Sequence, residues 1–162
     1  MNRLEIPIEW SGAFSLEEVI AEMTDEGDPP DYSGEDYGLY QIYGQHILCG
    51  ADTLLYIGKA TNQTFSLRFQ QHGREWLHDE ADVQIYLGRV YDPKRHSKSD
   101  DWDSWKWDVE LAEKILIYKY SPHYNSISIS NPPVLEPFKN IRLIHTNNRH
   151  QLEKEDNAPK DW

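Results

Sequence analysis

The chain has 162 residues, of which 38% are hydrophobic, and it contains one cysteine, Cys49. A chain of this length is expected to form one domain whose core needs no disulfide bonds, and a lone cysteine excludes an internal disulfide. The formal net charge of −12 by itself argues against nucleic-acid binding, because proteins that bind polyanions usually carry a basic patch.

The negative charge is concentrated at the N-terminus. Residues 1–37 contain eleven acidic residues and one basic residue, whereas the rest of the chain is nearly neutral, so a local basic face is compatible with the composition. No apolar run approaches the ~20 residues of a membrane-spanning helix. The start of the chain lacks the basic and apolar segments of a signal peptide. We therefore expect a cytoplasmic protein without a membrane partner.

The first predicted element is a short helix over residues 15–23. Ser15 is its expected N-cap, and Glu18 follows three residues later, as in a capping box. Residues 24–36 are rich in Asp, Glu, Gly and Pro, which predicts a solvated loop.

Strand and helix patterns alternate through the middle of the chain. Alternating aromatic and aliphatic residues predict strands over residues 37–43 and 53–58, paired antiparallel across a short connection. Residues 64–76 have a helical pattern, and residues 83–91 predict a third strand. The order up to this point is therefore two strands, a helix and a strand.

The longest predicted helix spans residues 104–120. Asp103 is its expected N-cap, and Pro122 follows its end as a stop signal. Residues 140–145 predict a short further strand, and residues 151–162 are expected to be frayed.

The long helix carries the first candidate for chemistry, Glu113. A carboxylate beside the apolar face of a helix is costly to bury unless it is paired or bound to a metal. The simpler alternative is a side chain that reaches solvent at the edge of that face. Glu110, one turn earlier, is either a solvated residue or, in place of Glu113, the residue that binds the metal. The apolar face is defined by residues at helical spacing, namely Val109, Ala112, Leu116 and Tyr120.

Arg68 and His72 form a second candidate pair on the preceding predicted helix. Their spacing of four residues places them on one helix face. An arginine can bind phosphate oxygens through two N–H groups, and a histidine can transfer a proton near neutral pH. The alternative is an ordinary solvated face of the helix.

Four segments of the chain, taken in order, form a recognisable pattern. Gly38-Leu39-Tyr40 and Tyr56-Ile57-Gly58 lie on the first two predicted strands, and residues 68–72 begin with arginine and end with histidine. Residues 113–125 begin with glutamate and an aliphatic run, and they contain a proline and a final asparagine. These segments resemble the GIY, YIG and two later motifs of the GIY-YIG nuclease family, with leucine in place of isoleucine in the first. The resemblance covers residues 37–125.

The resemblance implies an α+β fold with a small three-stranded antiparallel sheet flanked by helices, in the order β-β-α-β-α. Residues 37–125 would form this catalytic core. Residues 1–36 would be an acidic N-terminal extension with a short helix, and residues 126–162 a C-terminal extension with a disordered end.

The resemblance also implies a metal-dependent endonuclease that hydrolyses phosphodiester bonds. One divalent metal, Mg²⁺ or Mn²⁺, would be held chiefly by Glu113. Arg68 would stabilise the charge on the phosphate, and Tyr40 or Tyr56 would position or deprotonate the attacking water. His72 would orient a tyrosine or relay its proton. Which tyrosine is the base stays open.

Two further residues complete the expected site. A tyrosine of pKa ~10 is a weak base until a cation or a hydrogen bond lowers its pKa. Lys59, directly after Tyr56-Ile57-Gly58, could provide that cation. Asn125 would organise the site structurally, an assignment that comes from the family match alone.

The densest basic cluster lies in the loop before the long helix and comprises Lys94, Arg95 and Lys98. A solvated loop is the ordinary interpretation, and contact with phosphates is the functional one. The neighbouring tryptophans could stack on bases, although packing against the sheet is the simpler interpretation for Trp102, Trp105 and Trp107.

Nucleic acid is the expected partner, and the resemblance to the family favours duplex DNA over RNA. One alternative is a catalytically inactive GIY-YIG-like module that only binds nucleic acid or protein. Another is an interaction protein that acts through its acidic N-terminus, where a second copy or another protein could bind. Cleavage of plasmid DNA with magnesium and with chelator would separate these interpretations.

Overall fold

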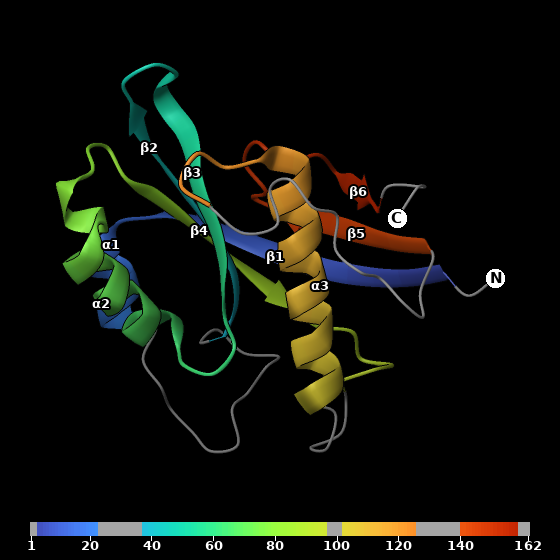
Figure 1. Cartoon of the computed structure of the whole chain (residues 1–162). Coiled ribbons are helices and arrows are strands. Elements are labelled where there is room, and N and C mark those ends of the chain that lie inside the picture. The colour runs from blue at the N-terminus through green and yellow to red at the C-terminus, as the bar shows by residue number, and fades with distance from the viewer. Residues whose placement is uncertain (1–2, 23–36, 97–101, 126–139, 159–162) are drawn as a thin grey trace.

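The structure, a computed structural model, describes residues 3–22, 37–96, 102–125 and 140–158. The predicted loop over residues 24–36 lies outside this part. Figure 1 shows the elements, which are β1 (Arg3–Phe14), α1 (Leu16–Glu22), β2 (Gly38–His46), β3 (Gly50–Ala60), α2 (Phe65–Glu75), the 3₁₀ helix η1 (Leu77–Asp79), β4 (Gln84–Val90), α3 (Trp102–Tyr120), β5 (Asn140–Asn147) and β6 (Glu155–Asn157).

The described strands form one six-stranded mixed sheet in the order β3-β2-β4-β1-β5-β6. Neighbouring strands are antiparallel except β1 and β5, which run parallel. The expected fold class, a small three-stranded antiparallel sheet with extensions at both ends, is therefore wrong. Strands β2, β3 and β4 do form an antiparallel unit, but β1, β5 and β6 extend the sheet beyond β4 (Figure 1).

Strand β1 is the largest departure from the expectation. Its residues alternate between an exposed face, which carries Glu5 and Glu9, and a buried apolar face. This period of two is a strand signal, but the acidic composition of residues 1–37 conceals it. Pro7 does not prevent the pairing of β1 with β4, because that register begins only at Ile8.

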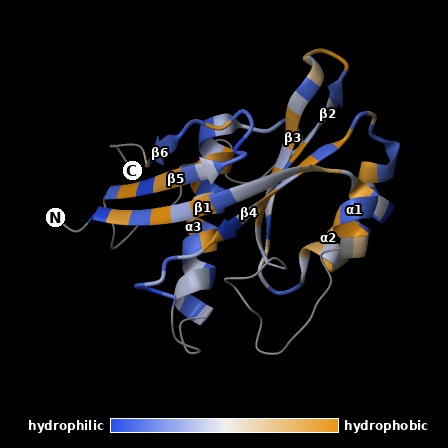
Figure 2. Ribbon diagram, turned by 180° about the vertical axis from the view of Figure 1, so that it is seen from behind, coloured by the Kyte–Doolittle hydropathy of each residue, from blue (hydrophilic) through white to orange (hydrophobic). Residues whose placement is uncertain are grey.

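Helices cover both faces of the sheet (Figure 1). Helix α3 shares a core cluster with Leu39 and Ile57, whereas α1 and α2 share another with Tyr40 and Ile42. Successive residues of a strand point to opposite faces, so Leu39 faces α3 and Tyr40 faces α2. Figure 2 shows the corresponding alternation of hydrophobic and hydrophilic residues along β1 and β5.

Local signals determine the helix ends. The hydroxyl of Ser15 accepts a hydrogen bond from the Glu18 amide at 3.1 Å, as the capping box predicts. Helix α3 begins at Trp102, so Asp103 lies in its first turn. The prediction that Asp103 is the N-cap is therefore wrong. The helix ends at Tyr120, before the predicted proline stop. None of the described helices combines the length and the apolar composition needed to cross a membrane.

The C-terminal segment is more ordered than its sequence predicts. Strand β6 pairs with β5 and buries Asp156. The indole of Trp10 donates to Nδ1 of His145 at 2.9 Å, and Nε2 of His145 lies 3.0 Å from Asp156. This buried network joins β1, β5 and β6. The prediction of a frayed end is therefore wrong for residues 151–158, and residues 159–162 lie outside the described part of the chain.

Candidate active site

The Tyr40 hydroxyl lies at the centre of a buried hydrogen-bond cluster between β2 and α2. It lies 2.7 Å from Nε2 of His72, and Nε of Arg68 donates to it at 3.2 Å. Arg68 and His72 share one face of α2, as their spacing predicts. That face packs on the sheet, since His72 is 2% exposed and Tyr40 is fully buried. The alternative of a solvated helix face is therefore wrong for His72.

The second partner of His72 determines the position of its hydrogen. Nε1 of Trp76 donates to Nδ1 of His72 at 3.1 Å, so a neutral ring carries its hydrogen on Nε2 and donates it to Tyr40. Burial, together with the charge of Arg68, lowers the pKa of His72 to about 4. Burial also raises the pKa of Tyr40, although Arg68 opposes that shift. At neutral pH, a neutral imidazole and a charged guanidinium thus both donate to one phenol oxygen.

Gly58 provides the space in which two tyrosines lie together. The rings of Tyr40 and Tyr56 are stacked, with their centroids 6.1 Å apart. A Cβ atom at Gly58 would overlap the Tyr40 hydroxyl and would lie 2.7 Å from Cε1 of Tyr56. The glycine of the Tyr56-Ile57-Gly58 segment is therefore required by its close contact with both rings.

Glu113 is neither fully buried nor solvated. Its side chain is 16% exposed, and one carboxylate oxygen lies 3.1 Å from Nζ of Lys59. Burial raises the pKa of Glu113, and the ammonium of Lys59 opposes this shift. Glu110 lies 3.7 Å from the same ammonium and is 34% exposed. Of the two glutamates, Glu113 is the more enclosed.

A pocket of about 230 Å³ lies beside the end of β3. It is bounded by residues 60–63, which lead from β3 into α2. Strand β3 is at the edge of the sheet, so side chains from both sheet faces can reach the pocket. Tyr40 and His72 are not in its lining, and Tyr40 contacts Arg68 from the buried side. The predicted catalytic residues that line it are Tyr56, Lys59, Arg68 and Glu113.

Asn125 stabilises the open edge of β3. Its side chain accepts a hydrogen bond from the amide of Ile57 at 3.0 Å and donates to the carbonyl of the same residue at 2.9 Å. The next residue back, Tyr124, donates its amide hydrogen to the carbonyl of Leu55 at 2.8 Å. Asn125 therefore holds the strand backbone between Tyr56 and Gly58, which is a structural role.

In the basic loop before α3, one of the predicted phosphate-binding residues, Arg95, is paired with a carboxylate of α3. Nη1 of Arg95 lies 2.6 Å from the buried carboxylate of Asp108 on α3, and Nε2 of His96 lies 2.9 Å from the same oxygen. Lys94 is exposed, and Lys98 lies outside the described residues. Arg95 is therefore engaged by the helix, which leaves Lys94 as the described cation of this cluster that faces solvent.

The tryptophans of α3 contribute mainly to packing. Trp105 is buried, and its Nε1 donates to the carbonyl of Val90 at 2.6 Å. Trp102 stacks on Trp105 with ring centroids 4.7 Å apart. Trp107 packs against the same core. The simpler of the two interpretations, packing against the sheet, holds for these residues.

The structure adds residues that the sequence interpretation omitted. Trp76, which orients His72, lies four residues after it, so the same helical spacing could have identified it. Gln71 accepts a hydrogen bond from Nη1 of Arg68 at 3.1 Å, and its amide donates to Gln63 at 3.0 Å. No local pattern marks Gln63, because it precedes the helix and meets Gln71 only in the folded chain.

The oxygen donors around Glu113 fit a hard divalent cation. Mg²⁺ typically takes one or two protein carboxylates and completes its coordination with waters and phosphate oxygens. Glu113 offers a carboxylate, and Thr61, Asn62 and Gln63, residue types whose side chains carry an oxygen atom, are among the residues that line the same pocket. A cation at Glu113 would require Lys59 to move toward Glu110, whose carboxylate already lies 3.7 Å from its Nζ.

No protein-family model, curated protein or solved structure matches this chain.

Proposed function

We propose that this protein is an endonuclease that hydrolyses phosphodiester bonds in nucleic acid, in the first place duplex DNA, with the help of a divalent cation. The observation that carries the proposal is the convergence of Tyr56, Lys59, Arg68 and Glu113, from β3, α2 and α3, on one pocket. Phosphodiester hydrolysis needs an activated water, positive charge beside the phosphate and help for the leaving oxygen. The resemblance to GIY-YIG nucleases supports the same assignment.

Arg68 is proposed to bind the scissile phosphate. Its Nε donates to Tyr40 and its Nη1 donates to Gln71, so the guanidinium is held in one orientation before any substrate binds. A group that is already ordered loses less conformational entropy on binding. The remaining N–H groups of Arg68 can donate to phosphate oxygens.

Tyr56 is proposed to contact the attacking water, because it lines the pocket whereas Tyr40 is fully buried. Tyr40 then acts as a positioning residue, whose hydroxyl orients Arg68 and accepts the hydrogen of His72. This division of roles explains why two adjacent tyrosines would both matter although only one of them can touch a water molecule.

Glu113 is proposed to hold the cation. A divalent metal bound there would polarise the phosphate and stabilise the leaving oxygen. Lys59 opposes the effect of burial on the pKa of Glu113, so it favours the ionised carboxylate that a cation requires.

The test is the conversion of supercoiled plasmid to nicked and linear forms with Mg²⁺, with Mn²⁺ and with chelator. We expect metal-dependent cleavage by the wild type and its loss in a Glu113→Gln variant purified in parallel, which controls for a contaminating nuclease. Binding of DNA without cleavage under any metal condition would favour the inactive binding module. Absence of both binding and cleavage would refute a role on DNA.

A further inference from the structure

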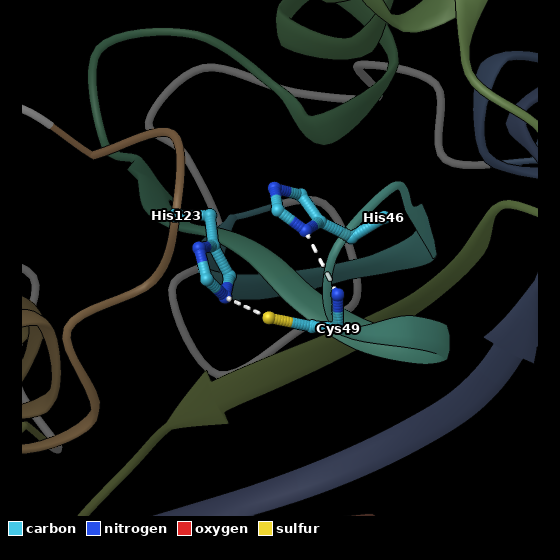
Figure 3. A group of neighbouring side chains, drawn as sticks. All are labelled: His46, Cys49 and His123. Carbon is cyan, nitrogen blue, oxygen red and sulfur yellow. Dashed lines mark hydrogen bonds between the residues drawn. The ribbon is translucent and has the colours of Figure 1, made fainter.

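A cluster of metal-ligating side chains lies away from this pocket, at the tip of the β2–β3 hairpin. It consists of His46, the last residue of β2, Cys49 from the hairpin turn and His123 from the loop after α3. One ligand atom from each residue lies within 4.8 Å of the other two. Figure 3 shows the three side chains gathered around the turn. Sγ of Cys49 lies 3.3 Å from Nε2 of His123.

These separations suit a small four-coordinate metal ion. In a tetrahedral zinc site, bonds of about 2.3 Å to sulfur and 2.0–2.1 Å to nitrogen place the ligand atoms about 3.3–3.6 Å from one another. The distance between Cys49 and His123 already lies in this range. The third ligand, His46, needs only a small approach from within 4.8 Å.

The sequence spacing of the two hairpin ligands is also typical of zinc sites. His46 and Cys49 are separated by two residues at a β-turn, the spacing at which paired ligands commonly hold zinc. The amides of Leu48 and Cys49 both point at Nδ1 of His46, each at 3.2 Å. That distance is at the upper limit of ordinary hydrogen bonds. A cation that binds the lone pair of Nδ1 would therefore compete only with these two weak contacts.

His123 is held in place by the fold. The residue after His123, Tyr124, donates its amide hydrogen to Leu55 on β3 at 2.8 Å, and Asn125 is bonded to Ile57. The loop after α3 is thus attached to the same hairpin that carries the other two ligands. The rings of His46 and His123 are stacked, with centroids 4.3 Å apart.

We infer that His46, Cys49 and His123 form a binding site for Zn²⁺, with three protein ligands and an open fourth position for water or a small ligand. One thiolate and two imidazoles select a borderline-soft cation over Mg²⁺ or Ca²⁺, which prefer oxygen ligands. As the Zn–S bond forms, the Cys49 thiol releases its proton to solvent.

This site is separate from the proposed cation site in position and in chemistry. None of its three residues is among those that line the pocket of Glu113. A metal ion bound there would tie the loop after α3 to the tip of the β2–β3 hairpin. The inference does not depend on the proposed nuclease activity.

Cobalt(II) is the probe for the test, with the purified full chain under a thiol-free reductant. The chain has a single cysteine, so a thiolate-to-cobalt charge-transfer band can arise only from Cys49. We expect this band and tetrahedral visible bands to saturate at one equivalent and to disappear when Zn²⁺ is added. Cobalt at the oxygen-rich pocket would produce neither signal.

Three variants and one control complete the experiment. Cys49→Ser should remove the charge-transfer band, and His46→Ala or His123→Ala should weaken Zn²⁺ binding at least about 10-fold, since even the outer partners of metal ligands contribute about 10–100-fold. His78 is an exposed histidine outside the cluster, so His78→Ala should change neither the charge-transfer band nor the affinity for Zn²⁺. A charge-transfer band that never forms would overturn the inference. Saturation at half an equivalent with a doubled mass would also overturn it, by placing the ion between two copies.

Discussion

Nε2 of His72 on α2 lies 2.7 Å from the hydroxyl of Tyr40 on β2, and both residues are buried. Nδ1 of the same ring accepts the indole hydrogen of Trp76, at the end of α2. Because both ring nitrogens have partners, His72 fixes the helix on the sheet and the orientation of the tyrosine together. A buried donor that loses its acceptor destabilises a protein by about 1–3 kcal/mol, so this contact links stability to the site.

The two tyrosines are expected to respond differently to the loss of their hydroxyl groups. Tyr56→Phe should lower the cleavage rate at least ~10²-fold, the lower end of a general acid–base contribution. Tyr40→Phe should also lower the rate, because Arg68 loses the hydroxyl that orients it. Only Tyr40→Phe removes the acceptor of His72, so only this variant should also lose about 1–3 kcal/mol of unfolding free energy. Single-turnover cleavage and urea denaturation measure the two effects. Normal cleavage by both variants would make the hydroxyls purely structural.

The charge of Glu113 is expected to be essential and that of Glu110 dispensable. Glu113→Gln keeps the shape of the side chain but removes the charge that holds a hard cation, so cleavage should fall at least ~10²-fold, as for other lost electrostatic contributions to a transition state. DNA binding and the melting temperature should stay close to those of the wild type. Glu110→Gln is the matched control. If Glu110→Gln were the inactive variant, the metal ligand would be Glu110.

Gly58 is expected to tolerate no side chain. In Gly58→Ala the added methyl would overlap the Tyr40 hydroxyl, and overpacking of a core typically destabilises by about 1–3 kcal/mol. The displaced tyrosines should also lower the cleavage rate. Gly73→Ala on α2 is the control, since its Cβ would lie 3.5 Å from Leu16 and alanine favours a helix by roughly 0.5–1 kcal/mol. Equal stability of the two variants would contradict the packing described here.

Stability is expected to depend on pH through His72. Its pKa is lowered from 6.5 to about 4 in the folded chain, so between these values the unfolded chain binds a proton that the folded chain does not. The free energy of unfolding should therefore be highest above pH 6.5 and should fall as the pH decreases to about 4. The contribution of this one residue is of the order of 3 kcal/mol.

Urea denaturation at a series of pH values measures this effect. His72→Gln has no imidazole to titrate, so its unfolding free energy should change less over the same pH range. Exposed His78 provides the control, and His78→Ala should reproduce the slope of the wild type. Parallel profiles for the wild type and His72→Gln would show that other groups cause the dependence.

Several elements could be predicted from the sequence because their signals are local. Alternation predicted β2, β3 and β4, helical periodicity predicted α2 and α3, and the capping pattern at Ser15 predicted the start of α1. The spacing of Arg68 and His72 placed them on one helix face for the same reason. In each case the residues that define the pattern lie within a few positions of one another along the chain.

The extent of the sheet and the grouping of the site were decided by the tertiary structure. The parallel pairing of β1 with β5 joins segments more than a hundred residues apart, and no local pattern specifies which strand edges pair. The contacts of Tyr40 with His72 and of Cys49 with His123 arise in the same way. The sequence by itself therefore determined which residues share a helix or strand face. The tertiary structure decided which of these faces pack together. Packing is favourable because it buries apolar surface from distant segments, and the free energy of that burial is gained only when the whole chain folds.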